Sequence, residues 1–221
     1  MKNYLLITTA TSLSLAASIA LAGGSTPMMP ATSSTFSPHA YIEAMTGYAN
    51  TAWSDITGDG TADVTFNYTK NDSGGFAWGA DIGYQWTSWL AVELGGFKLP
   101  TTDLEVQPTG APSTYSGSIE GSIFYLAAKL SHTINKKSLF TKVGLNYQNT
   151  QVSDSLSSGD DGINSNIYYG PFFGVGMSYA CKPYLSFKIE YDRASGQADH
   201  GGDNYAPNPN IFVAGLSYSF G

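Results

Sequence analysis

Eight charged residues interrupt otherwise apolar or small-residue stretches of this chain, and both signs are present among them. They are Glu43, Asp81, Glu93, Lys129, Lys142, Lys188, Glu190 and Asp192. Carboxylates and ammonium groups that leave water together can satisfy one another through hydrogen-bonded ion pairs. In each stretch the charge shares its parity with glycine, serine or alanine, while the opposite parity is apolar. The sequence therefore predicts an ion network in a shared interior, centred on Glu43, Asp81, Glu93, Lys129, Lys142, Lys188 and Glu190.

A second group of oxygen-bearing residues lies in the run DITGDGTAD. This run spaces possible ligands around Gly60, at Asp55, Thr57, Asp59 and Asp63. The spacing partly matches a Ca²⁺-binding loop, but Phe66 occupies the twelfth position, where such loops carry a bidentate glutamate. We therefore expect no cofactor other than weakly bound Ca²⁺, with a solvated acidic turn as the alternative.

The elements that position these residues are predicted by alternation with a period of two, which is typical of strands with two different faces. In the last stretch, Phe212, Leu216 and Phe220 share one parity, and Gly215 and Ser217 the other. Eight stretches show this pattern: 40–48, 77–86, 90–95, 124–131, 139–148, 173–179, 185–192 and 211–220.

The connections between the stretches are long and short in turn. Tight turns fall at 86–89, 134–138 and 181–184, whereas long polar connections span 50–73, 99–116, 150–165 and 194–208. Charged residues make up only 12% of the chain and aromatic residues 14%, with aromatics gathered near both ends of the stretches. A soluble β-sandwich would also alternate, but this loop pattern favours an all-β, eight-stranded antiparallel transmembrane β-barrel. Short turns would then be periplasmic and long loops extracellular.

The N-terminal residues predict export. Met1-Lys2 is followed by an apolar stretch and by Ala20-Leu21-Ala22, a small-x-small cleavage site. We therefore expect a signal peptide over 1–22, a flexible periplasmic lead over 23–38 and the barrel over 39–221. Cys181 is the single cysteine, so no intrachain disulfide can form.

The stretches GADIGYQWTSWLAVELG, LAAKLSHTI, SFKIEYD and GLSYSFG, in this order, resemble the transmembrane domain of the outer membrane protein A (OmpA) family. The resemblance implies a Gram-negative outer-membrane location and a lumen plugged by two acids and two bases. Glu93 matches one acid, and Lys129 and Lys188 match the bases, but Ser178 stands where the second acid is expected, with Glu190 nearby to compensate. The resemblance also makes Phe220 the signal read by the barrel-insertion machinery, although Gly221 follows it. No peptidoglycan-binding domain is expected.

The long connections are all acidic, which argues against nucleic-acid binding. Their acids, opposed only by Lys70, are Asp55, Asp59, Asp63, Asp72, Asp103, Glu105, Asp154, Asp160, Asp161, Asp199 and Asp203. We expect a monomeric surface protein that contacts outer-membrane lipids and lipopolysaccharide and binds an extracellular ligand, host or matrix, through these loops. The loop charge could equally serve solubility alone.

Two other functions remain open at this stage. One is a narrow, low-conductance, porin-like pore. The other, less favoured, is a lipid A-modifying enzyme, which needs a histidine and a nucleophile together near the outer rim. His39 and His132 both fall near the short-turn ends of their strands, away from the outer rim. Only His200 remains in an outer loop, and no His-x-Ser motif exists. We therefore expect no enzymatic activity.

Overall fold

The computed structural model describes residues 36–51, 66–71, 74–108, 115–154, 166–196 and 207–220. The predicted signal peptide, most of the predicted lead, the Asp55–Asp63 run and His200 lie outside the described residues, as do most of the loop acids. Among the described residues no helix is long and apolar enough to cross a membrane.

Ten strands make up the described part of the chain. They are β1 His39–Asn50, β2 Phe66–Asn71, β3 Gly74–Gln85, β4 Leu90–Lys98, β5 Thr102–Pro108, β6 Tyr115–Ile134, β7 Lys137–Asp154, β8 Asn166–Lys182, β9 Leu185–Ala194 and β10 Asn210–Phe220.

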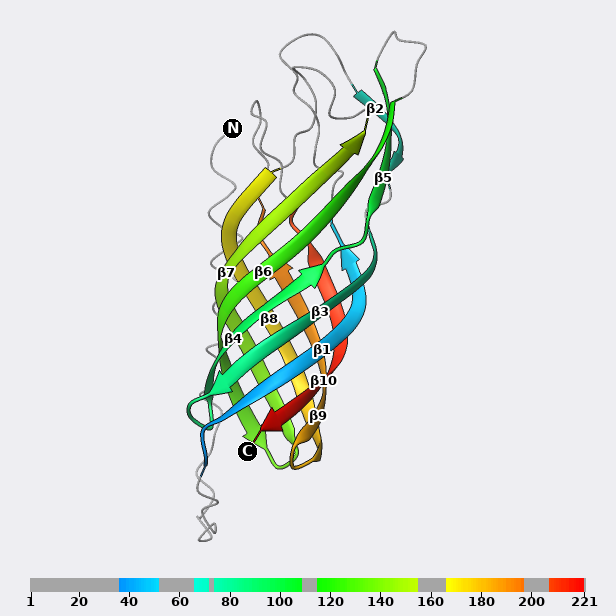
Figure 1. Cartoon of the computed structure of the whole chain (residues 1–221). Helices are drawn as coiled ribbons and strands as arrows, with labels where there is room; N and C mark the ends of the chain where they lie inside the picture. The colour runs from blue at the N-terminus through cyan, green and yellow to red at the C-terminus, as the bar shows by residue number, and fades with distance from the viewer. Residues whose placement is uncertain are drawn as a thin grey trace, which may run out of the picture. The chain divides into compact units, whose positions relative to one another are not determined.

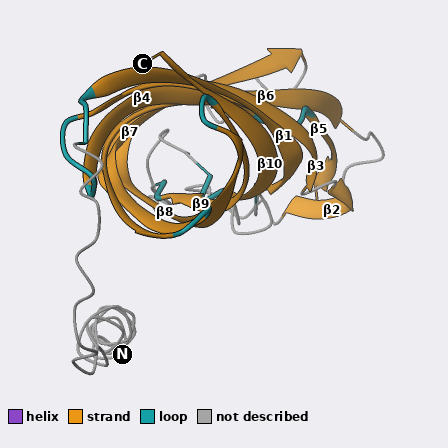
Figure 2. Ribbon diagram, turned by 90° about the horizontal axis from the view of Figure 1, so that it is seen from below, coloured by secondary structure: helices purple, strands orange, loops and turns teal. Residues whose placement is uncertain are grey.

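Eight of these strands close into a ring (Figure 2). The ring order is β1-β3-β4-β6-β7-β8-β9-β10, with every pair antiparallel. The first and last strands of the chain close it, since Glu43 of β1 lies opposite Asp81 of β3 on one side and Ser217 of β10 on the other. The predicted eight-stranded antiparallel barrel is therefore confirmed.

The exposure of side chains alternates along the ring strands because successive side chains of a strand point to opposite faces. On β7, Lys142 is 0% exposed and Leu145 is 70% exposed. The exposed apolar side chains form a band around the outside of the barrel, where Ile82, Leu126, Phe187 and Leu216 also lie. An apolar outer face with a polar inner face suits a barrel set in lipid rather than in water.

Three ring strands extend far beyond the predicted stretches, and two extra strands occur in connections predicted to be loops. β6, β7 and β8 have 20, 18 and 17 residues. β5 pairs with the first part of β6, and β2 pairs with β5, so the sheet extends past the ring at the long-loop end (Figure 1). The prediction of loops over all of 50–73 and 99–116 is thus wrong, because backbone groups of those segments pair with a strand that projects beyond the barrel.

The three predicted tight turns all lie at the opposite end, together with the start of β1 and the end of β10 (Figure 1). In the two-residue turn between β6 and β7, Asn135 has a φ of 57°. Asparagine tolerates this left-handed conformation better than most residues. In the β3–β4 turn, the Thr87 hydroxyl accepts a hydrogen bond of 3.0 Å from the Leu90 amide.

Candidate functional site

The predicted network residues lie together inside the barrel, contributed by strands far apart in the sequence. Glu43 comes from β1, Asp81 from β3, Glu93 from β4, Lys129 from β6, Lys142 from β7, and Lys188 and Glu190 from β9. All seven are buried, with at most 8% of the residue exposed. We call these seven residues the lumen cluster.

Lys142 contacts three acids of the lumen cluster. Its ammonium nitrogen lies 2.6 Å from Glu93 Oε2, 2.5 Å from Glu190 Oε1 and 3.5 Å from Asp81 Oδ2. The same nitrogen lies 5.5 Å from the centre of the Tyr125 ring, within the range of a cation–π contact. A fully buried ammonium needs such partners to offset the loss of its hydration.

The other two lysines complete the network. Lys188 forms an ion pair with Glu43, lies 2.8 Å from Glu190 Oε2 and lies 3.4 Å from Asp81 Oδ2. Lys129 lies 2.7 Å from Glu93 Oε1 and 3.4 Å from Glu43 Oε1. Each of the four acids therefore contacts two lysines, so the loss of one lysine leaves none of them without a cation.

Glu190 contacts the lysine that the OmpA resemblance places as the second base. Ser178, at the position of the missing acid, lies opposite Lys188 in the β8–β9 register and is half-buried. One of the three carboxylate partners of Lys188 thus comes from its own strand, two residues further on, because residues i and i+2 of a strand point to the same side.

Two tyrosine hydroxyls belong to the site and were not predicted from the sequence. Tyr41 Oη donates to Glu93 Oε1 at 2.6 Å, and Tyr125 Oη donates to Asp81 Oδ1 at 2.6 Å. Both tyrosines share the inward parity of the charged residues on their strands, so an inward-facing phenol beside a buried acid was the available signal.

Asp192 also faces inward, but it forms no ion pair with a lysine within the described residues. It is 0% exposed, and neither carboxylate oxygen has a hydrogen-bond partner in the described structure. Its side chain lies against Gly174, where an added Cβ would meet Asp192 Oδ1. The glycine therefore makes room for a fifth carboxylate beside the lumen cluster.

The carboxylates of Glu43, Asp81 and Glu93 are close enough to share one metal ion, since an oxygen from each lies within 4.8 Å of the others. Ammonium groups of Lys129, Lys142 and Lys188 already contact these acids. The chain thus supplies its own cations, and the arrangement suits a permanent ion network better than an exchangeable metal.

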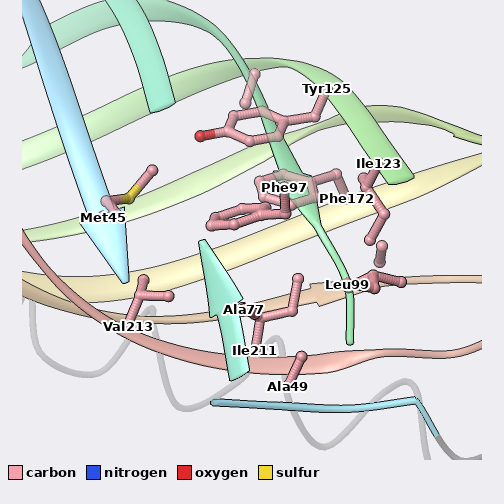
Figure 3. Close-up of a cluster of buried hydrophobic side chains, with 12 residues drawn as sticks. Met45, Ala49, Ala77, Phe97, Leu99, Ile123, Tyr125, Phe172, Ile211 and Val213 are labelled. Carbon is pink, nitrogen blue, oxygen red and sulfur yellow. The ribbon is translucent and has the colours of Figure 1, made fainter. Parts of the chain in front are cut away.

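An apolar layer of buried side chains, also not predicted, lies inside the barrel next to the lumen cluster; Figure 3 shows the side chains of this layer. The ring of Tyr125 stacks on that of Phe172 at a centroid distance of 4.1 Å, and on that of Phe97 at 5.9 Å. We call the layer the aromatic plug; its other members include Met45, Ala49, Ala77, Leu99, Ile123, Ala194, Ile211 and Val213.

The position of the aromatic plug follows from the order of residues along each strand. On β4, Phe97 is nearer the long loops than Glu93, and on β6, Tyr125 is nearer to them than Lys129. Towards the short turns the lumen cluster meets a further aromatic residue, because Lys129 Nζ lies 4.5 Å from the centre of the buried Phe140 ring. Side chains thus fill the interior in successive layers.

The described histidines lie apart from this interior. His39 begins β1, where its Nδ1 lies 2.9 Å from the Ser37 carbonyl oxygen, and His132 is exposed near the short-turn end of β6. These positions agree with those inferred from the sequence, and they provide no histidine within the lumen cluster.

Comparisons with known proteins agree with this architecture. The family model of the outer membrane protein β-barrel domain matches residues 16–220, whereas no curated protein matches the chain. Neisserial surface protein A (NspA) is 15% identical, with 84% of this chain and 100% of that one covered, and a TM-score of 0.52. The N-terminal barrel of Pseudomonas aeruginosa OprF is 14% identical, with 82% and 97% covered and a TM-score of 0.48. The likeness to NspA shows a shared fold.

Proposed function

Since the chain belongs to the outer membrane protein β-barrel family and is a protein of the outer membrane, we propose that it acts at the cell surface, where its long loops bind an extracellular ligand. The barrel serves as a rigid anchor for these loops and does not conduct solutes. No enzymatic activity is part of this role.

The filled interior is the observation that carries the proposal. The lumen cluster and the aromatic plug together occupy the cross-section with side chains that are nearly all buried. An eight-stranded barrel leaves room inside for side chains and little else. With the interior occupied, the long-loop end is the part of the molecule open to a partner.

The chemistry of the loops limits the class of ligand. Acids outnumber bases in all four loops, with Lys70 the only opposing charge. A surface of this kind repels polyanions and attracts basic surfaces, or acidic ones through divalent cations. We therefore propose a basic host or matrix protein as the ligand, which the acidic loops attract directly.

Adhesion of cells that display the protein to a surface coated with extracellular matrix tests this role. The first and third long connections, 50–73 (loop one) and 150–165 (loop three), are trimmed to short turns. Heat-modifiable gel migration checks that each variant still forms a barrel. The expected result is loss of adhesion with the gel shift retained. Adhesion that survives trimming of both loops, in a folded variant, would contradict the proposal.

Removal of charge without a change in loop length provides a matched control. Asp160→Asn with Asp161→Asn removes two charges and leaves the length of loop three unchanged. Weaker adhesion in this variant indicates recognition of charge. Full adhesion combined with loss on trimming indicates recognition of loop shape, and the basic-ligand class would then be wrong.

Conductance across planar lipid bilayers tests the closed lumen. We expect no discrete conductance from the unmodified protein, and none from Lys129→Ala, because the aromatic plug is intact. Lys129→Ala combined with Phe172→Ala removes side-chain volume from both layers and should produce small openings. Discrete conductance by the unmodified protein would favour the narrow pore instead.

A further inference from the structure

Three lysines gather at two neighbouring turns of the short-turn end. Lys136 lies in the β6–β7 turn, Lys137 is the first residue of β7, and Lys182 is the last residue of β8. The turns are adjacent because β7 pairs with β8, and the Ala180 amide donates to the Lys136 carbonyl oxygen at 2.8 Å. All three side chains are exposed. We call them the basic rim.

Aromatic side chains are interleaved with the basic rim. Tyr179 lies opposite Lys137 in the β7–β8 register, and Lys182 Nζ lies 5.9 Å from the centre of the Tyr184 ring. Both tyrosines are exposed, at 46% and 43%. Tyrosine rings of this kind sit at the level of lipid headgroups, where lysines extend their ammonium groups out of the hydrocarbon.

The apolar band begins immediately beside the basic rim. Ile134, the last residue of β6, is 60% exposed and lies opposite Lys137, and Met177 on β8 is 50% exposed. The lysines therefore border the hydrocarbon on one side and water on the other, which is the depth of phosphate groups in a bilayer.

No acid balances this charge in the described part of the chain. The described acids with resolved side chains lie in the interior, as Glu43 and Asp81 do, or at the long-loop end, as Asp103 and Glu120 do. No ion pair joins Lys136, Lys137 or Lys182 to any residue within the described ranges. An unopposed group of three cations attracts anions of the adjoining surface.

We propose that the basic rim binds the phosphate headgroups of anionic phospholipids in the periplasmic leaflet of the outer membrane. Lys137 and Lys182 bracket one headgroup from adjacent strands, and Lys136 adds charge from the water side. The tyrosines fix the depth of the site through contacts with the upper acyl chain. The site is at the end of the barrel opposite the extracellular loops, so it does not depend on their ligand.

The geometry favours a lipid over a soluble anion. A soluble phosphate gains nothing from the exposed apolar side chains beside the lysines, whereas a phospholipid occupies both surfaces at once. Juxtamembrane lysines contribute about fivefold each to the binding of anionic lipid at moderate salt. Removing Lys137 and Lys182 should therefore weaken binding by about thirtyfold.

Native mass spectrometry of the detergent-released full chain, titrated with phosphatidylglycerol and separately with phosphatidylcholine, measures this preference. We expect tighter binding of phosphatidylglycerol, and loss of most of that preference in Lys137→Gln with Lys182→Gln. Lys137→Arg with Lys182→Arg should retain it. The heat-modifiable gel shift verifies that each variant is folded. We expect all variants to fold, because Lys137 and Lys182 are exposed at strand ends.

Removal of two cations near the other rim provides the matched control. Lys98→Gln with Arg193→Gln deletes the same charge, and its preference should change by less than about twofold. An equal loss in this control, or an unchanged preference in the glutamine variant of the basic rim, would overturn the proposal. Displacement of phosphatidylglycerol by an equal concentration of inorganic phosphate would overturn the lipid class of the ligand.

Discussion

Replacement of Lys142 by methionine tests whether the lumen cluster stabilises the barrel. The substitution keeps most of the side-chain length and removes the ammonium group that contacts Glu93 at 2.6 Å and Glu190 at 2.5 Å. Breaking a buried ion pair from one side costs about 3–5 kcal/mol. Glu93 retains Lys129 at 2.7 Å and Glu190 retains Lys188 at 2.8 Å, so we expect the lower end of this range.

Urea unfolding of the protein in lipid vesicles, followed by tryptophan fluorescence, provides the assay. With a denaturant slope of about 2 kcal/mol/M, a loss of about 3 kcal/mol lowers the urea midpoint by about 1.5 M. Adding Glu190→Gln to Lys142→Met removes one of the three carboxylates that lost a partner, and should recover about 1 kcal/mol.

The ion pair at the outer rim serves as the comparison. Lys98 Nζ lies 2.7 Å from Glu120 Oε2, but the two side chains are 37% and 49% exposed. Because water screens such a pair, Lys98→Met should cost at most about 1 kcal/mol. Equal midpoints for Lys142→Met and Lys98→Met would refute the argument that burial of the lumen cluster makes its ion pairs matter.

Three further predictions concern the wall, the lipid face and the loops. Gly144→Ala should destabilise the barrel by about 1–3 kcal/mol in the same unfolding assay, because the added Cβ would meet the backbone of β6. In Gly121→Ala the added Cβ meets only the end of a leucine side chain, so this control variant should cost less. Leu145 is 70% exposed in the middle of β7, so Leu145→Arg should lower the free energy of unfolding in vesicles by about 2–4 kcal/mol. Ile134→Arg, at the short-turn rim, should lower it by about 0–1 kcal/mol. The reverse order would contradict the placement of the apolar band in lipid. Calorimetric titration should detect Ca²⁺ binding no tighter than about millimolar, abolished by Asp59→Asn, and submicromolar binding would contradict the incomplete ligand set.

The sequence alone predicted the properties that depend on neighbours along the chain. Alternation with a period of two is local, so the parity of Glu93, Lys142 and Leu145 identified which side of each strand is polar. The placement of the apolar side toward lipid followed from the cost of charge in hydrocarbon. The order of long and short connections then predicted the number of strands and which end carries the loops.

Only the tertiary structure decided which of these residues meet. Glu43 and Lys188 form an ion pair across 145 positions of sequence, and that contact depends on ring closure and on the stagger of strands around it. The aromatic plug has the same origin, because the rings of Phe97, Tyr125 and Phe172 stack only when β4, β6 and β8 have their observed registers. Strand pairing also produced β5, whose partner is a part of β6 that no local pattern showed to extend beyond the barrel, and β2, whose partner is β5. Parity is a property of one strand, whereas register and closure belong to the whole ring, and for that reason the sequence predicted the faces while the fold determined the contacts.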